Sequence, residues 1–111
     1  MSSDRMRRVD EALREVLSDA VGGDLKDPRI GFVTVTDVKT SPDLRHARVY
    51  VSVLGDDAAR KASIEGLNSA HGLLQRRIAG ELRLKRTPML EFVLDDTVDK
   101  AMRIEELLDD H

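Results

Sequence analysis

The 111-residue sequence contains no cysteine and no tryptophan, has three prolines, and is 3 % aromatic. Without cysteine there is no disulfide and no thiolate chemistry, which fits a reducing cytosol, so we expect a cytoplasmic protein. The scarcity of aromatic residues predicts a core of aliphatic side chains. No apolar run approaches the ~20 residues that span a bilayer, and the charged segment 1–10 does not resemble a signal peptide. We therefore expect no membrane partner.

Length and composition predict one globular domain. A chain of 111 residues with 41 % hydrophobic side chains can bury one real core. No repeat, linker or low-complexity segment divides it, and we expect a single domain over residues 1–111 that is a monomer.

No group of residues predicts a catalytic or metal site. His46, His71 and His111 have no ligand spacing such as HxxxH. The acidic run 95–99 could hold Mg²⁺ in a nuclease, but helix capping beside a helix dipole explains it better. No other carboxylate, His or Lys stands at a spacing that completes such a site, so a small hydrolase has little support. We predict a binding protein that is no enzyme and uses no cofactor or metal.

Charge is distributed unevenly along a chain whose net charge is −3. A free RNA-binding protein is usually basic, so the total argues against that class. Segment 73–90 nevertheless has a net charge of +4, and segment 91–111 has a net charge of −6. A basic segment followed by an acidic one indicates a local binding surface.

Hydrophobic periodicity predicts the order helix, strand, strand, helical stretch, strand, helix. The first helix is expected over about residues 4–21, and Gly22-Gly23 can end it. Segments 32–39 and 45–53 read as strands joined by a tight turn at 40–43. In the second strand one set of side chains should face the core: Ala47, Val49, Val51 and Val53.

The second half of the chain contains the longer helical pattern. Its apolar stripe comprises Ile64, Leu67, Ala70, Leu74, Ile78 and Leu82. Periodicity does not decide whether this helix kinks at Gly66, Gly72 or Gly80. Thr87-Pro88 ends it, and alternation over 90–94 predicts a third strand. A last helix is expected to present Ala101, Ile104, Leu107 and Leu108 on one face. This pattern predicts an α+β domain with a three-stranded sheet and helices on one face.

Short motifs spread over nearly the whole chain add a family resemblance. They are Arg8-Val9, Asp27-Pro28-Arg29-Ile30, Val33-Thr34-Val35-Thr36, Asp43-Leu44, Val49-Tyr50-Val51, Ala70-His71-Gly72, Leu84-Lys85 and Arg103-Ile104. In order and spacing they resemble the bacterial ribosome-binding factor A family. Gln75, Met89 and Ala101 depart from residues common in that family.

The resemblance implies a type II KH-like domain, with an extra C-terminal helix, in which a helix-kink-helix replaces the usual GxxG loop. An Ala-x-Gly marks the kink, here Ala70, His71 and Gly72. It also implies binding to the small (30S) ribosomal subunit, through 16S rRNA and ribosomal proteins, and late maturation of that rRNA.

We predict that RNA is contacted by the kink, by Arg29, and by the basic segment. The basic residues are Arg76, Arg77, Arg83, Lys85 and Arg86. Such cations neutralise phosphates but do not read sequence. Plainer readings remain open: a glycine tolerated inside one helix, a solvated basic helix face, and a simple turn at 27–29. A protein–protein adaptor that touches no RNA is the alternative function. Tyr50 is expected to pack on the sheet surface. Because the basic segment has no aromatic residues between its cations, we do not expect it to bind RNA by base stacking.

Overall fold

A computed structural model describes residues 4–23 and 25–95. The elements are α1 (Asp4–Gly23), β1 (Val33–Thr40), β2 (His46–Val53), α2 (Asp57–Ser69), α3 (His71–Glu81) and β3 (Met89–Leu94). The helices and strands that the sequence predicts in this range are confirmed, and most of their ends lie within about two residues of the prediction. The exception is the end of the helical stretch, which lies at Glu81 and not at Thr87-Pro88. The expected C-terminal helix lies outside the described residues. Within the described part, no helix is long and apolar enough to cross a membrane.

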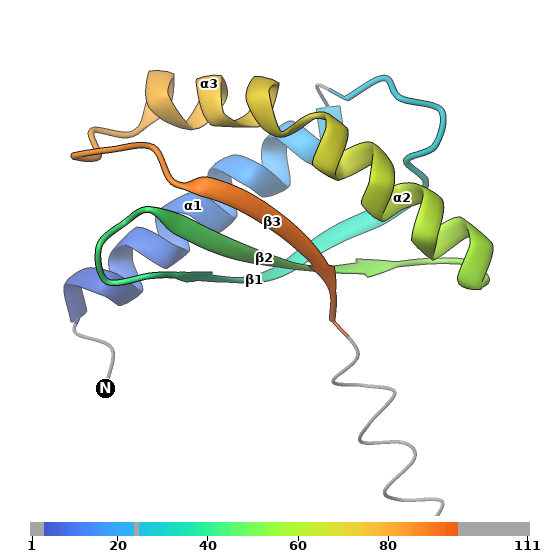
Figure 1. The fold of residues 1–111 in the computed structure, drawn as a ribbon, viewed down its shortest axis with the longest axis horizontal. Helices are drawn as coiled ribbons and strands as arrows, with labels where there is room; N and C mark the ends of the chain where they lie inside the picture. Colours follow the sequence, from blue (N-terminus) through green and yellow to red (C-terminus); the bar gives the residue numbers. More distant parts are fainter. Residues whose placement is uncertain (1–3, 24, 96–111) are drawn as a thin grey trace, which may run out of the picture.

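The three strands form one mixed sheet in the order β1-β2-β3. β1 and β2 are the expected antiparallel hairpin, whereas β3 runs parallel to β2, with Val49 beside Phe92. Parallel strands need a long crossover, which α2 and α3 provide here. Figure 1 shows α1 behind the sheet, and α2 and α3 along its upper border.

The core lies on one face of the sheet, as the alternation predicts. Ala47, Val49, Val51 and Val53 are all buried, whereas Arg48 and Ser52 on the opposite face are exposed. The helices close this core with fully buried leucines and an isoleucine: Leu13, Leu17, Leu67, Leu74 and Ile78. Phe92 of β3 is the one aromatic side chain among the buried residues of the described core. The aliphatic core and the single helix-covered face are therefore confirmed.

A β-bulge interrupts the regular alternation of β1. The pairing with β2 shifts between Val35 and Asp37, so Thr36 is the extra residue. As a result the buried residues of this strand, Val35 and Val38, stand three positions apart. The Thr36 hydroxyl donates to the backbone oxygen of Tyr50 at 3.2 Å and contacts Asp95 Oδ2 at 2.6 Å.

Two side chains of the helical stretch bond the outer edge of β3 and the residue that precedes this strand. The Asn68 Oδ1 accepts a hydrogen bond from the Phe92 N–H at 3.2 Å, and Gln75 Nε2 donates to the Pro88 carbonyl at 2.9 Å. Edge strands offer unpaired backbone groups that can pair with other chains. These two amides satisfy part of that edge and fix the helical stretch beside β3.

The loop between α1 and β1 is fastened to α2. The buried Ser63 Oγ accepts from the Gly31 N–H at 3.1 Å and lies 3.4 Å from the Arg29 carbonyl. The loop also packs so closely on α2 that a Cβ on Gly66 would lie 2.6 Å from Ile30 Cγ1. This packing sets the position of Asp27 and Arg29 relative to the end of α2.

Candidate nucleic-acid interface

The helical stretch breaks at Ala70, between α2 and α3. Ala70 has φ −87° and ψ 5°, and its N–H still donates to the carbonyls of Gly66 and Leu67 at 3.1 Å. Leu74 N–H in turn donates to the Ala70 carbonyl at 3.1 Å. Periodicity left open whether the stretch kinks, and the structure places the kink at the first residue of Ala70-His71-Gly72.

Gly72 faces open space at the start of α3. A Cβ built there would meet nothing within 4 Å, and the position has no positive φ. Neither core packing nor backbone conformation therefore requires glycine here. An unobstructed backbone beside a helix N-terminus suits the close approach of an anion.

A groove of about 610 Å³ runs past the kink to the loop before β1. Lys26 and Asp27 line it on the loop side, and His71, Gly72 and Arg76 on the helix side. Lys26, His71 and Arg76 are exposed. His71 Nδ1 lies 2.7 Å from the Asn68 carbonyl, which can only accept, so this nitrogen carries the proton and Nε2 is left for a partner.

Arg29 is held in its own loop. Its guanidinium donates to Asp27 at 2.6 Å and 3.1 Å, and its backbone N–H donates to Asp27 Oδ1 at 2.9 Å. These hydrogen bonds lower the pKa of Asp27 and raise that of Arg29. The guanidinium of Arg29 is thus held by Asp27, and Asp27 rather than Arg29 lines the groove at the kink.

Arg77 joins α3 to α1. Its Nη2 lies 2.5 Å from Asp19 Oδ2, and its Nε lies 3.1 Å from Glu81 Oε1. The side chain is 26 % exposed. Because two carboxylates hold this guanidinium, Arg77 positions α3, and the neighbouring exposed Arg76 is the better placed of the two for a phosphate.

The remaining basic residues lie at the other end of α3. Arg83, Lys85 and Arg86 belong to the loop from α3 to β3 and line a groove with Arg5 of α1. An 11-residue α-helix is ~16 Å long, so this loop is separated from the kink by that distance. The sequence groups these cations in one segment, but the fold divides them between two places. Arg5 lies about 80 positions from this loop in the sequence, and sequence spacing carries no signal for a contact over that distance.

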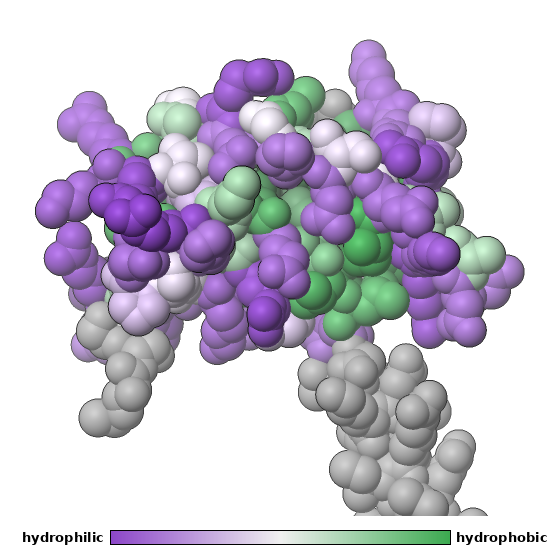
Figure 2. Space-filling model, in the orientation of Figure 1, coloured by the Kyte–Doolittle hydropathy of each residue, from purple (hydrophilic) through white to green (hydrophobic). Residues whose placement is uncertain are grey.

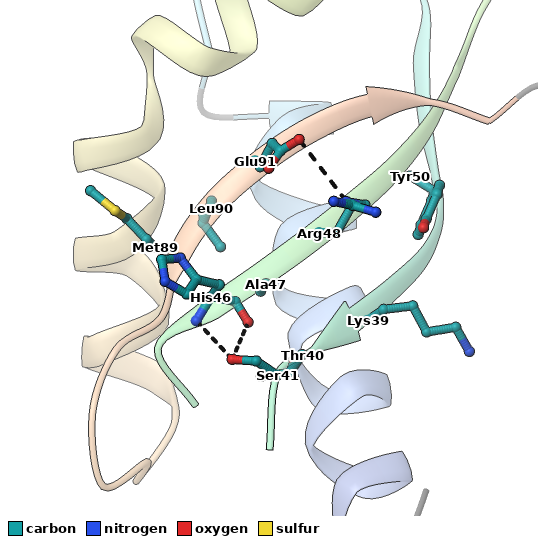
Figure 3. Close-up of a pocket in the computed structure, with 10 residues that line it drawn as sticks. All are labelled: Lys39, Thr40, Ser41, His46, Ala47, Arg48, Tyr50, Met89, Leu90 and Glu91. Atoms are coloured by element: carbon teal, nitrogen blue, oxygen red, sulfur yellow. Dashed lines mark hydrogen bonds and ion pairs between the residues drawn. The ribbon is translucent and has the colours of Figure 1, made fainter. Parts of the chain in front are cut away.

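The open face of the sheet contains a further hollow of about 510 Å³ (Figure 3). Its charged side chains face partners: Arg48 Nε lies 4.0 Å from Glu91 Oε1, and Lys39 Nζ lies 3.6 Å from Asp37. Ser41 Oγ accepts from the His46 N–H at 3.1 Å and lies 3.1 Å from the His46 carbonyl oxygen. Tyr50 is half-buried on this face, as a packing role on the sheet surface requires. This paired, polar surface offers less to a phosphate than the kink does.

Among residues 4–23 and 25–95, no cluster of three or more His, Cys, Asp or Glu residues could hold a metal ion. Asp96 to Asp99 of the acidic run lie outside this range. In the described part, the Asp95 carboxylate contacts a threonine hydroxyl. The geometry of the described residues thus offers surfaces for binding.

Comparison with known proteins decides the family. The model of the family described as ribosome-binding factor A matches residues 5–108. The chain belongs to the ribosome-binding factor A family. It is 52 % identical to ribosome-binding factor A of Anaeromyxobacter sp. (strain K) over 105 residues, which cover 94 % of this chain and 76 % of the relative.

Solved structures agree with this membership. A solution structure of a putative ribosome binding factor A from Thermotoga maritima has a TM-score of 0.74 and 37 % identity, covering 84 % of this chain and 89 % of that one. A homology model of the Thermus thermophilus factor, fitted into an electron cryo-microscopy map of a 30S complex with that factor, has a TM-score of 0.65 and 28 % identity, covering 78 % of this chain and 91 % of that one. The family resemblance and the α+β, KH-like fold class are confirmed.

Proposed function

We propose that this chain binds the small (30S) ribosomal subunit and assists the late maturation of its 16S rRNA. Membership of the ribosome-binding factor A family supports a binding factor, and the Thermus thermophilus relative was fitted into a map of its complex with 30S. The chain acts by binding and carries out no catalysis. Since the proposed partner is a ribosomal subunit, the cytoplasm is the proposed site of action.

The observation that carries the RNA contact is the open kink. A Cβ at Gly72 would contact no atom within 4 Å, so packing does not require glycine there, and His71 and Arg76 beside it are exposed. We assign the phosphate contacts at this place to the backbone around Gly72 and to Arg76. Arg29 and Arg77 support the surface through their bonds to Asp27, Asp19 and Glu81.

Gly72→Asp tests the contact without disturbing the fold. Gly72 is the second residue of α3, where a carboxylate is favoured by the helix dipole, and its Cβ meets nothing. The same carboxylate repels a phosphate. Ala58→Asp is the matched control, because exposed Ala58 is the second residue of α2.

We expect wild type and Ala58→Asp to co-sediment with separated small subunits, and Gly72→Asp to bind at least ten times more weakly with an unchanged circular dichroism spectrum. If Gly72→Asp bound as tightly as Ala58→Asp, the kink would not be part of the RNA interface. Wild-type protein confined to ribosome-free fractions at low salt would refute the function itself.

The adaptor alternative has one specific observation in its favour. Phe32 and Leu54 are 81 % and 76 % exposed, and they lie side by side because Leu54 N–H donates to the Phe32 carbonyl at 3.0 Å. Two large apolar side chains at one end of the sheet fit a contact with protein. A protein contact there would weaken on Phe32→Ser with no change in the salt dependence of binding, since no cation is lost.

A further inference from the structure

We propose a second RNA-contacting surface at the far end of α3, a basic groove formed by three segments distant in sequence. It rests on the proposed function, since it takes RNA of the same particle as its ligand. Its volume is about 680 Å³. The start of α1 provides Arg5, the turn between β1 and β2 provides Leu44, and the loop from α3 to β3 provides Arg83, Lys85 and Arg86. Figure 1 shows these three segments at the same end of the molecule.

The four cations of the basic groove are available to a ligand. Arg5, Arg83, Lys85 and Arg86 are all exposed, and within the described part of the chain none makes an ion pair or a side-chain hydrogen bond. Elsewhere most arginines are held by carboxylates, including Arg14, Arg29 and Arg77. Four unpaired cations around one hollow repel each other and favour an anion between them.

Among the described residues, Asp43 is the one acid that lines the basic groove, and it is already engaged. Asp43 accepts from the Ser41 hydroxyl at 2.7 Å and from the Arg45 N–H at 3.0 Å, and these bonds lower its pKa. It therefore stays ionised and turned toward its own turn. The lining retains an excess of positive charge, and Figure 2 shows strongly hydrophilic side chains at this end.

The floor of the basic groove is apolar. Met6, Leu44 and Leu84 line it, and each is half-buried. Leu44 has φ 60°, a left-handed conformation that non-glycine residues rarely adopt. An apolar floor between cations suits a sugar-phosphate strand, whose riboses or unstacked bases can lie on the floor while its phosphates face the cations.

The exposed side of α3 connects the basic groove with the kink. Gly72, Arg76 and Gly80 follow at intervals of four residues and so lie on one face of the helix. A Cβ at either glycine would meet nothing within 4 Å. An RNA strand that leaves the kink can pass Arg76 and an unobstructed helix surface before it reaches Arg83. Two contact points ~16 Å apart on a rigid helix would read the path of the strand rather than its sequence.

The test compares two double variants with the same loss of charge. Arg5→Gln with Arg86→Gln removes two cations of the basic groove. Arg8→Gln with Lys61→Gln is the control, because Arg8 and Lys61 are exposed, have no ion pair within the described residues, and line neither the basic groove nor the kink groove. Binding to separated small subunits is measured from 50 to 200 mM salt.

We expect the slope of log affinity against log salt to fall by ~0.7–0.9 per phosphate contact in the groove variant, and to stay unchanged in the control. Identical slopes and affinities for both variants would overturn the basic groove while leaving the proposed function intact. A weaker affinity with an unchanged slope would also overturn the RNA contact of the basic groove, because Arg5 and Arg86 would then contact a protein and not phosphates. Failure of the wild-type protein to bind any subunit would refute the proposed function, and this proposal with it.

Discussion

Among single residues, Gly66 occupies the tightest contact between α2 and the loop before β1. Its missing side chain lets Ile30 approach, and Ile30 belongs to the loop that carries Asp27 and Arg29. Glycine inside a helix normally destabilises it by ~1 kcal/mol relative to alanine. Space at this contact therefore outweighs helix propensity.

Gly66→Ala is expected to lower the free energy of unfolding by about 1–2 kcal/mol. The new Cβ would lie 2.6 Å from Ile30 Cγ1, and relief requires the β-branched Ile30 and its loop to move. Gly80→Ala, with nothing within 4 Å of its Cβ, is the control and should be neutral or stabilising. Urea unfolding measures both. A Gly66→Ala variant as stable as Gly80→Ala would show that the loop yields freely.

The ion pair of Asp27 and Arg29 predicts a pH-dependent loop. The hydrogen bond from Arg29 lowers the pKa of Asp27, so the stabilisation is present above the ordinary aspartate pKa and is lost as pH falls through the lowered value. Carboxyl chemical shifts followed from pH 6 to 2 should give Asp27 a pKa below the ordinary value. In Arg29→Gln the pKa should return toward it, and an identical titration in both proteins would contradict the pairing.

Arginine roles show where residue-level prediction from sequence ends. Arg76 and Arg77 are adjacent and look equivalent in the sequence, yet one is exposed and the other is held by Asp19, 58 positions away. Only the packing of α3 on α1 separates them. The sequence contains the charge of each residue but not the identity of its partner.

At the scale of elements, the burial of β2 is the prediction most directly derived from alternation. Val51 is fully buried between the sheet and its helices. Val51→Asp would bury a charge without a partner, costing several kcal/mol against a typical total stability of ~5–15. We expect a largely unfolded protein by circular dichroism.

Ser52→Asp is the control for that substitution, because Ser52 follows on the exposed face of the same strand. It should keep the native spectrum and melting temperature within a few degrees. A Val51→Asp protein that melts like the control would mean that the opposite face of β2 carries the core.

Local pattern predicts the elements because each one is encoded by its own residues. Hydrophobic residues recur with the helical period over residues 4–21 and with the strand period over residues 45–53. The structure has α1 and β2 at these positions. The bulge at Thr36 and the parallel direction of β3 were not predicted. Both depend on how a strand meets its neighbour, and a neighbour leaves no period in the strand itself.

For the whole molecule, the arrangement of charge matters more than its sum. The chain is acidic, with a net charge of −3, yet the fold brings Arg5 to the loop of Arg83, Lys85 and Arg86. It also separates this loop from Arg76 by the length of α3. The sequence shows that segment 73–90 has a net charge of +4. It does not show that the fold puts Arg76 at the kink, Arg77 in an ion pair with Asp19, and the other three cations in the basic groove.

The parallel pairing of β3 also governs the order in which the chain can fold. β1 and β2 can pair as soon as both exist, whereas β3 must return to a strand that lies about 40 residues earlier, with α2 and α3 between them. During synthesis at ~5–20 residues per second, β2 would wait roughly 2–8 s for this neighbour. A nascent chain would therefore expose the Val-rich edge of β2 for seconds. Any contact that protects this edge from aggregation must form during translation.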